Sequence, residues 1–438
     1  MQRRLHNRNI AVSILAMAIS AALANPVANA QPRATNAEPA WCASRCDAIV
    51  VDWNATAYQL FKAANNYADP LGASRVLAMM HLAMHDAVNA ARPRYATFAL
   101  DERDAQADPA VAAASAAHDV LVALFPAQQG IAKVELDKSL VEAGIGEPVK
   151  RGVALGKRAA AAVLAKRAND GSASKVAYAQ GTRPGEYRFT PGFDFVALPQ
   201  WKSMQPFTLG SASQFRSEPP PGLNSASYTA AFNEVKAVGG KAPAHAKRTV
   251  DETNYASFWY EFSDIGWNRI ARVVSRDEPQ DLWQRARTFA LLNAVMADAY
   301  VAGWDSKFHY NVWRPVTAIR LADTDGNAAT MPDATYEPLL VTPPVQDYPS
   351  THSALGAAAA GVLAHSFGRD NVAFTFSSTS ALPANPTRSF ASFSEAAREN
   401  ADSRVKAGLH FRFATTAGLK LGDDIAKHAT RHALLPVD

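Results

Sequence analysis

Apolar residues recur at helical spacing along most of this 438-residue chain. An apolar side chain at every third or fourth position marks one face of a helix, and no stretch sustains the two-residue alternation of a half-buried strand. Helices are predicted over residues 49–65, 73–91, 109–124, 131–143, 147–168, 226–237, 264–275, 280–303, 353–366, 392–407 and 411–433. The pattern predicts an all-α protein made of helical bundles, in two units that resemble four-helix bundles, with long irregular loops.

Two long segments interrupt the helical pattern. Residues 169–225 are rich in Gly, Pro, Ser and aromatic side chains, and the run Glu218–Gly222 breaks any helix. Residues 323–349 form a second, turn-rich segment. We therefore expect an N-terminal helical region over residues 31–225, including an ordered excursion at 169–225, and a C-terminal helical domain over residues 226–438.

The N-terminus has the pattern of a cleavable export signal. Three arginines precede an apolar run from Ile10 to Leu23, and Ala28 and Ala30 form a small-residue cleavage site. A short anchor helix is the alternative, but the apolar run is short for a membrane span. The sequence predicts that residues 1–30 are a signal peptide and that the mature protein is periplasmic or secreted.

Composition and charge narrow the classes of partner. With 48% hydrophobic and 19% charged residues, the chain can bury a large core. Because the predicted signal holds three Arg and no acidic residue, its removal lowers the formal charge from +4 to +1. No basic run remains for nucleic acid or a membrane surface. The two cysteines, Cys42 and Cys46, predict a local disulfide, since a thioredoxin-type pair has two residues between them rather than three.

The first piece of candidate chemistry is Lys307 with Arg314-Pro315. The two cations are seven residues apart, so on one helix both would project from one face. Arg314 can bind an oxyanion through two parallel hydrogen bonds, and Lys307 acts as a point charge. A solvated basic face is the alternative, but the large aromatic neighbours Trp304 and Trp313 are unusual on a helix face exposed to water.

The second piece is Pro349-Ser350-Thr351-His352. The preceding prolines cannot be helical throughout, and the run of small residues that follows is a good helix former, so we expect a helix to start here. Free backbone N–H groups and the helix dipole favour an anion at that position. Ser350 adds a donor and His352 can exchange a proton there. An ordinary N-cap beside a histidine is the alternative.

The third piece is Ser403-Arg404 with His410 behind it. Arg404 adds a guanidinium and His410 an imidazole. Because six residues do not return to one face of a straight helix, the two side chains can meet only if the helix breaks near Gly408.

In order and spacing, these three pieces resemble the signature of the vanadium-dependent haloperoxidases and the related acid and phosphatidate phosphatases, with the bacterial haloperoxidase-like branch as the nearest resemblance. The resemblance implies that Lys307, Arg314 and Arg404 neutralise the non-protein oxygens of vanadate or phosphate. It implies that Ser350 and the backbone N–H of Thr351 add hydrogen bonds.

The resemblance also assigns the two histidines. His410 would bond to the central atom, as a metal ligand to vanadium or as the nucleophile toward phosphorus. His352 would be the acid–base group. The implied activity is a haloperoxidase that uses vanadate, hydrogen peroxide and halide to give hypohalous acid or a halogenated small organic product. The alternatives are an acid phosphatase acting through a phosphohistidine, with phosphate in the site, and an inactive anion-binding exported protein. A homodimer is left open.

The chain departs from the family pattern at two positions. Thr351 stands where the family often has Gly, although its backbone N–H is retained. Ala414 stands where many members have an Asp that orients the second histidine. Asp298, Asp402 or a carbonyl group are the candidates to replace that carboxylate.

Other polar clusters favour structural roles. His81 and His85 have a spacing that can bind a metal, but no third ligand is apparent beside Asp86, so a core or supporting helix is expected. The run Asp323–Asn327 lacks the glycine position and the closing Glu of a calcium loop, and a polar turn is expected. Val345 lies in the region expected to line the halide side.

Overall fold

The structure is a computed structural model that describes residues 43–65 and 69–437, all within one compact unit. It is mostly helical, which confirms the predicted class. The helices are α1 (Ala43–Ala63), α2 (Pro70–Ala91), α3 (Pro109–Leu124), α4 (Gln129–Ala143), α5 (Glu147–Arg167), α6 (Ala226–Val238), α7 (Val250–Phe258), α8 (Ser263–Asp277), α9 (Leu282–Tyr310), α10 (Pro315–Arg320), α11 (Thr351–Ser366), α12 (Phe393–Lys406) and α13 (Arg412–His432). The strands are β1 (Phe374–Ser377) and β2 (Thr387–Phe390).

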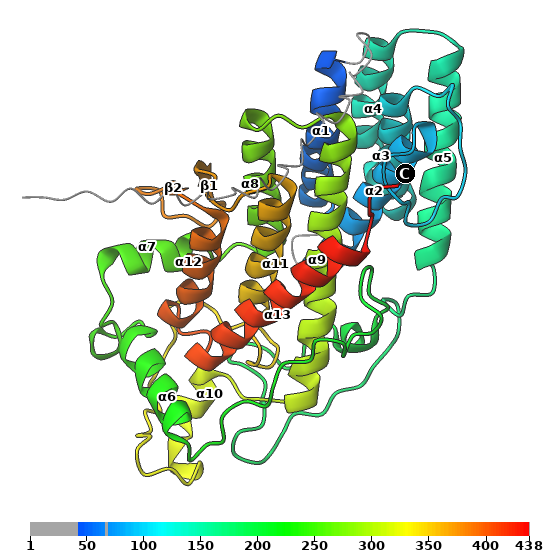
Figure 1. Ribbon diagram of the computed structural model, residues 1–438. Helices are drawn as coiled ribbons and strands as arrows, with labels where there is room; N and C mark the ends of the chain where they lie inside the picture. Colours follow the sequence, from blue (N-terminus) through cyan, green and yellow to red (C-terminus); the bar gives the residue numbers. More distant parts are fainter. Residues whose placement is uncertain (1–42, 66–68, 438) are drawn as a thin grey trace, which may run out of the picture. The chain divides into compact units, whose positions relative to one another are not determined.

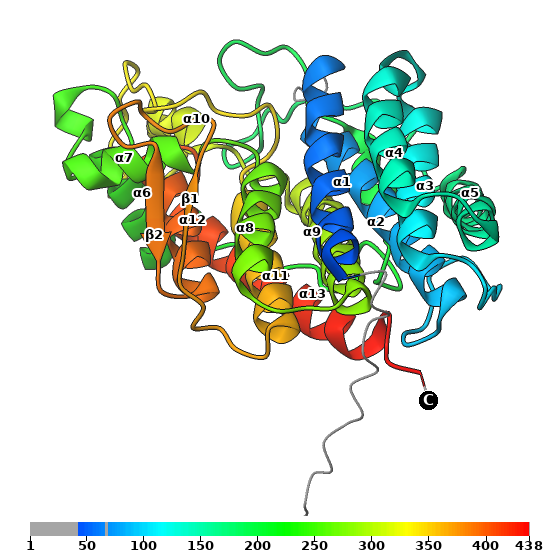
Figure 2. The ribbon, with the colours of Figure 1, turned by 90° about the horizontal axis from the view of Figure 1, so that it is seen from above.

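Helix α9 is the central element of this unit. It packs on α2 on one side and on α11 and α13 on the other. Helices α1 to α5 gather beside one flank of α9, and α6, α7, α10 and α12 lie beyond α11 and α13 (Figures 1 and 2). The main core follows the same arrangement, because nearly every residue of α9 from Leu282 to Lys307 is buried. The proposed domain division at residues 225 and 226 stays a prediction.

Three short elements were not predicted: α7, α10 and the hairpin of β1 and β2. Helix α7 begins with a reciprocal capping box between Thr249 and Glu252, a local signal that sequence reading could have used. The hairpin is antiparallel and pairs Phe374 with Phe390. Its four-residue strands are too short for alternation to be recognised.

The excursion over residues 169–225 is irregular but ordered, as expected, with one short 3₁₀ turn at Pro199–Ser203. It is tied to the C-terminal half of α9 and the segment after it. The backbone N–H of Tyr187 donates to the carbonyl of Asn311 at 2.7 Å, and Trp313 N–H donates to Gly185 at 2.9 Å. These bonds hold the chain where α9 ends.

Helix α11 is clamped at its first turns by close backbone approaches. A Cβ added at Gly303 of α9 would lie 2.4 Å from Thr351 Cγ2. A Cβ at Gly418 of α13 would lie 2.2 Å from the carbonyl oxygen of Ser350. Since real Cβ atoms are not found at such distances, these glycines let both helices pack directly on the N-terminus of α11.

The export signal at residues 1–30 and Cys42 lie outside the described residues. Cys46, at the start of α1, is disulfide-bonded and buried. Within residues 43–65 and 69–437, no helix is long and apolar enough to cross a membrane.

Candidate active site

Lys307 and Arg314 meet at one place, but not on one helix face as the spacing predicted. Helix α9 ends at Tyr310, because Asn311 adopts a left-handed conformation with φ of 52°, and Arg314 is the N-cap of α10 before Pro315. Lys307 Nζ donates to the carbonyls of residues 346 and 347 at 2.6 and 3.1 Å. Arg314 Nε donates to the carbonyl of Val345 at 2.7 Å. One loop therefore holds both cations.

The second piece starts a helix, as predicted. Ser350 is the N-cap of α11 and accepts from the Ser353 N–H, whereas the N–H of Thr351, the first residue of the helix, has no acceptor within the helix. Ser350 Oγ accepts a hydrogen bond from Ser353 Oγ at 3.0 Å, which leaves its own proton free to donate. Ser350 is fully buried, and its backbone N–H donates to Ala414 at 2.9 Å.

The third piece contains the break that was predicted near Gly408. Helix α12 ends at Lys406, Gly408 has a φ of +79°, and α13 begins at Arg412. The backbone N–H groups of Leu409 and His410 return to the carbonyl of Arg404 at 3.0 and 3.3 Å. Glycine tolerates the left-handed conformation, so the turn brings His410 back toward Arg404.

These three pieces converge on one buried cluster. Arg314 Nη1 lies 2.9 Å from His410 Nε2, and it also donates to the carbonyl of Leu409 at 2.8 Å. Burial, together with the positive charges of Arg314, Lys307 and Arg404, lowers the pKa of His410 well below its usual range. Burial and Arg314 lower the pKa of Lys307 in the same way. These side chains shift one another's pKa values because they lie close together in one buried region.

Positive charge exceeds negative charge in this cluster. Lys307, Arg314 and Arg404 are at most 1% exposed. Asp347 supplies a carboxylate that lies 3.9 Å from Arg314 Nη1, and among the described residues no carboxylate pairs with Arg404. Arg404 Nε and Nη1 are buried without a hydrogen-bond partner in the described chain, and burial lowers the pKa of Arg404 to about 9. An oxyanion is the guest that satisfies unpaired buried guanidinium groups.

His352 faces the same cluster from the first turn of α11. Its Nε2 donates to the carbonyl of Glu261 at 3.1 Å, and its side chain is partly exposed, unlike the three cations. Burial and the charge of Arg404 lower the pKa of His352 well below 6.5, so the imidazole is neutral near pH 7. A neutral histidine beside buried cationic side chains can accept a proton once an anion offsets their charge.

Asp347 is a site residue that sequence reasoning missed. Its Oδ1 lies 2.9 Å from His410 Nδ1, and its side chain is fully buried. The expectation that Asp298 or Asp402 orients His410 is wrong. Asp298 accepts from the backbone of Phe207 at 2.6 Å, and Asp402 contacts Tyr255.

No signal of spacing pointed to Asp347. It lies two residues before the second sequence piece, whereas the family pattern places the orienting carboxylate in the third piece. The contact is seen only in the folded loop, which brings Asp347 next to His410.

The other polar clusters are structural, as expected. Asp86 accepts backbone hydrogen bonds from Phe98 and Ala99, both at 2.7 Å, and His81 contacts Asn54 at 2.8 Å. Asp325 closes a polar turn by accepting from Asn327 at 2.8 Å. In the described ranges, no group of three His, Cys, Asp or Glu residues could hold a metal ion. A conventional metal cage is therefore absent from that part of the chain.

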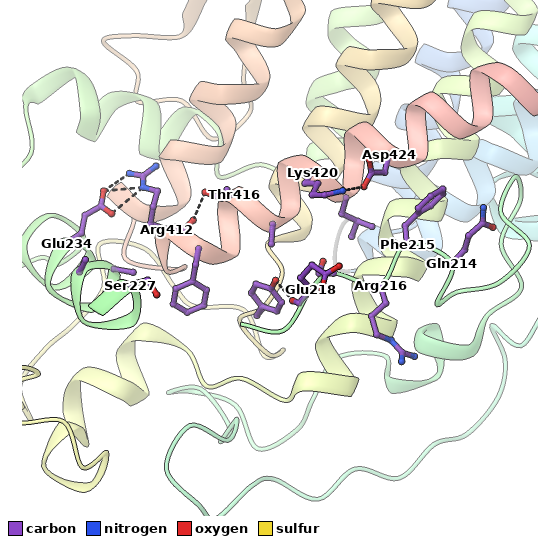
Figure 3. Close-up of a pocket in the computed structure, with 17 residues that line it drawn as sticks. Gln214, Phe215, Arg216, Glu218, Ser227, Glu234, Arg412, Thr416, Lys420 and Asp424 are labelled. Atoms are coloured by element: carbon purple, nitrogen blue, oxygen red, sulfur yellow. Dashed lines mark hydrogen bonds and ion pairs between the residues drawn. The ribbon is translucent and has the colours of Figure 1, made fainter. Parts of the chain in front are cut away.

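A separate cavity of about 780 Å³ lies between α6, α13 and the 214–218 segment (Figure 3). Tyr348 lines it, but none of the seven predicted site residues does. Most of its charged side chains are already paired, as Arg412 is with Glu234 and Lys420 with Asp424. The buried cationic cluster is thus distinct from this cavity.

The fold and the cluster together define a helical protein with a buried cluster of cationic side chains and histidines. Comparison with known proteins is consistent with that class. Residues 287–438 match the family model described as the VCPO second helical-bundle domain. The vanadium chloroperoxidase of Curvularia inaequalis is 25% identical over 491 residues, which cover 84% of this chain and 79% of that protein.

Solved structures extend the likeness. A bacterial vanadium-dependent iodoperoxidase has 26% sequence identity and a TM-score of 0.76, over 90% of this chain and 98% of that chain. A bacterial vanadium-dependent chloroperoxidase shares the fold, with 17% identity and a TM-score of 0.68 over 84% of this chain and 93% of its own. In sequence and in fold, the chain is therefore similar to vanadium haloperoxidases over most of its length.

Proposed function

We propose that this enzyme binds vanadate in the buried cationic cluster and oxidises halide with hydrogen peroxide. The observation that carries the proposal is the set of three buried cations, of which Arg404 keeps two N–H donors without a partner in the described chain. Burying such groups costs free energy unless a ligand compensates them. A small tetrahedral dianion has the charge and the acceptor atoms that this cluster requires.

In this proposal each residue has a separate task. Lys307, Arg314 and Arg404 hold the oxygens of vanadate, and the Ser350 hydroxyl and Thr351 N–H donate further hydrogen bonds. His410 would present its Nε2 to the central atom of the bound vanadate. Bound vanadate supplies a Lewis acid that activates peroxide without a change in oxidation state.

His352 moves the proton. In the free site its pKa is lowered by burial and by Arg404, so it is neutral. A bound anion offsets those cations and raises the pKa of His352 toward its usual value, which allows the imidazole to take up and return a proton. The partial exposure of His352 favours approach of peroxide and halide from its side of the site.

The test is a pair of assays on purified protein reconstituted with vanadate. Iodide, bromide and chloride are supplied with hydrogen peroxide, beginning with iodide because it needs the weakest oxidant. We expect vanadate-dependent halide oxidation. Turnover of p-nitrophenyl phosphate alone would instead support the phosphatase alternative, which Asp347 keeps open because it gives His410 the carboxylate that position 414 lacks.

We also propose that the protein is exported. The export pattern of residues 1–30 and the disulfide bond of Cys46 support this, since disulfides persist in oxidising compartments. N-terminal sequencing of protein recovered from the periplasm or medium should begin at Gln31. Recovery of uncleaved protein from the cytoplasm would contradict the proposal.

A further inference from the structure

We propose that Asp347 is the positioning residue of His410: its carboxylate holds the proton on Nδ1 and thereby directs the Nε2 lone pair toward the bound oxyanion. This inference rests on the proposed function for the identity of the guest. The contact on which it stands is between two side chains of this chain, 2.9 Å apart.

The backbone of Asp347 is held by hydrogen bonds on both its N–H and its carbonyl group. Its backbone N–H donates to the carbonyl of Val312 at 2.9 Å, and its own carbonyl accepts from Lys307 Nζ at 3.1 Å. The side chain is fully buried, with Oδ1 2.9 Å from His410 Nδ1. The fixed backbone and the burial of the side chain keep the carboxylate beside the imidazole.

The neighbours of His410 select one tautomer. Arg314 Nη1 lies 2.9 Å from Nε2, closer than its 3.3 Å from Nδ1. A guanidinium has donors and no acceptor, so the shorter contact favours the tautomer in which Nε2 carries the lone pair. The proton of the neutral ring is then on Nδ1, the nitrogen that lies 2.9 Å from Asp347 Oδ1. Nε2 thus faces the cations, on the side where the oxyanion would lie.

The side chain of residue 414 cannot orient the His410 imidazole. Ala414 is fully buried, packs in an apolar cluster with Tyr348 and Phe411, and uses its carbonyl to accept from Ser350. The orienting carboxylate has therefore moved from the first turn of α13 to the loop before α11. The same loop holds Lys307 and Arg314, so anion binding and imidazole orientation share one support.

The first test is the tautomer of His410 in protein free of vanadate. Nitrogen-15 NMR of histidine-labelled protein, with the His410 signals assigned by comparison with His410→Gln, should show a protonated Nδ1 and an unprotonated Nε2. A protonated Nε2 in the wild type would overturn the proposal. This measurement needs no variant at Asp347 and no bound vanadate, so it can stand even if the proposed function fails.

The second test separates positioning from a general structural role. Asp347→Asn keeps the size but can donate to Nδ1, which should mix or reverse the tautomer. We expect vanadate binding to weaken by about 10- to 100-fold, in line with loss of a carboxylate behind a metal-bound histidine. Sulfate, which needs no bond from Nε2, should bind as well or better because a negative charge is removed.

Asp402→Asn is the matched control, since Asp402 contacts Tyr255 and Arg412 and not His410. It should keep the wild-type tautomer and affinities. Equal loss of vanadate and sulfate binding in Asp347→Asn, or unchanged vanadate binding with an unchanged tautomer, would overturn the positioning role. Wild-type protein that binds no vanadate but shows an Asp347-dependent tautomer would refute the proposed function and leave the positioning role intact.

Discussion

Arg404 is a single residue whose burial lowers the stability of the fold but provides donors for a ligand. Its guanidinium is 1% exposed, two of its N–H donors have no partner in the described chain, and burial lowers its pKa to about 9. A buried charge without a partner destabilises a fold. Such a group is retained where a ligand supplies the missing acceptors.

Arg404→Gln should therefore weaken oxyanion binding and stabilise the ligand-free protein. Hydrogen bonds to charged groups contribute about 1.5–3 kcal/mol each, so vanadate or sulfate affinity should fall by about 10- to 100-fold. Titration calorimetry and thermal unfolding give the two readouts. Arg398→Gln, an exposed site on the same helix, is the control and should change neither quantity. A lower melting temperature for ligand-free Arg404→Gln would contradict this account.

The two histidines should separate binding from proton transfer. His410→Ala removes the group at the central atom and should abolish vanadate retention. His352→Ala should keep vanadate and lower the rate by about 10²- to 10⁴-fold, the usual contribution of general acid–base catalysis. Metal analysis of dialysed protein and steady-state rates measure both effects, with exposed His365→Ala on α11 as the control. Equal vanadate content in wild type and His410→Ala would refute the assigned ligand.

At the level of elements, the N-terminus of α11 is positioned by glycines on its neighbours. Gly418→Ala would bring a methyl group to 2.2 Å from the carbonyl oxygen of Ser350. We expect a loss of about 1–3 kcal/mol in stability from overpacking, together with weaker oxyanion binding because Ser350 is displaced.

Gly130→Ala in α4 is the matched control for Gly418→Ala. No atom lies within 4 Å of its added Cβ, so it should stabilise by up to about 1 kcal/mol. Denaturant unfolding and sulfate titration of both variants provide the comparison. Unchanged sulfate affinity in Gly418→Ala would show that this packing does not position the anion site.

The long helices could be predicted from sequence because their apolar positions recur over many turns. The predicted helix at 280–303 was too short, however, since α9 continues to Tyr310 and carries Lys307 in its last turn. Arg314 was placed on the wrong element because the left-handed residue Asn311 ends α9 and has no signature in the hydrophobic pattern.

The sequence singled out the candidate site residues without giving the elements that hold them. The cations, Ser350 and both histidines came from three sequence pieces whose order and spacing are specific. Asp347 could not be found, because its role depends on a long-range contact with His410. Such a contact depends on tertiary packing and leaves no local pattern.

At the level of the whole molecule, buried histidines tie stability to pH. Burial lowers the pKa of His81 to about 3, and His352 and His410 are shifted in the same direction. These rings are neutral in the folded protein and take up protons when it unfolds below pH 6.5. Their contribution is complete above pH 6.5 and is lost as the pH falls through that value toward 3.

For His81 alone, the loss between pH 7 and pH 5 is about 2 kcal/mol, from its shift toward 3. Urea unfolding of ligand-free protein at both values should show stability decreasing with acidity. His81→Leu should flatten part of that dependence. Stability that rises on acidification, or a slope unchanged by His81→Leu, would contradict the assignment.

The most direct measurement of the central claim is a crystal structure of the protein soaked with vanadate. The account predicts one vanadium centre bonded to His410 Nε2, with its oxygens contacted by Lys307, Arg314 and Arg404. Vanadate bound elsewhere, or a site that stays empty at saturating vanadate while these side chains keep their positions, would contradict it.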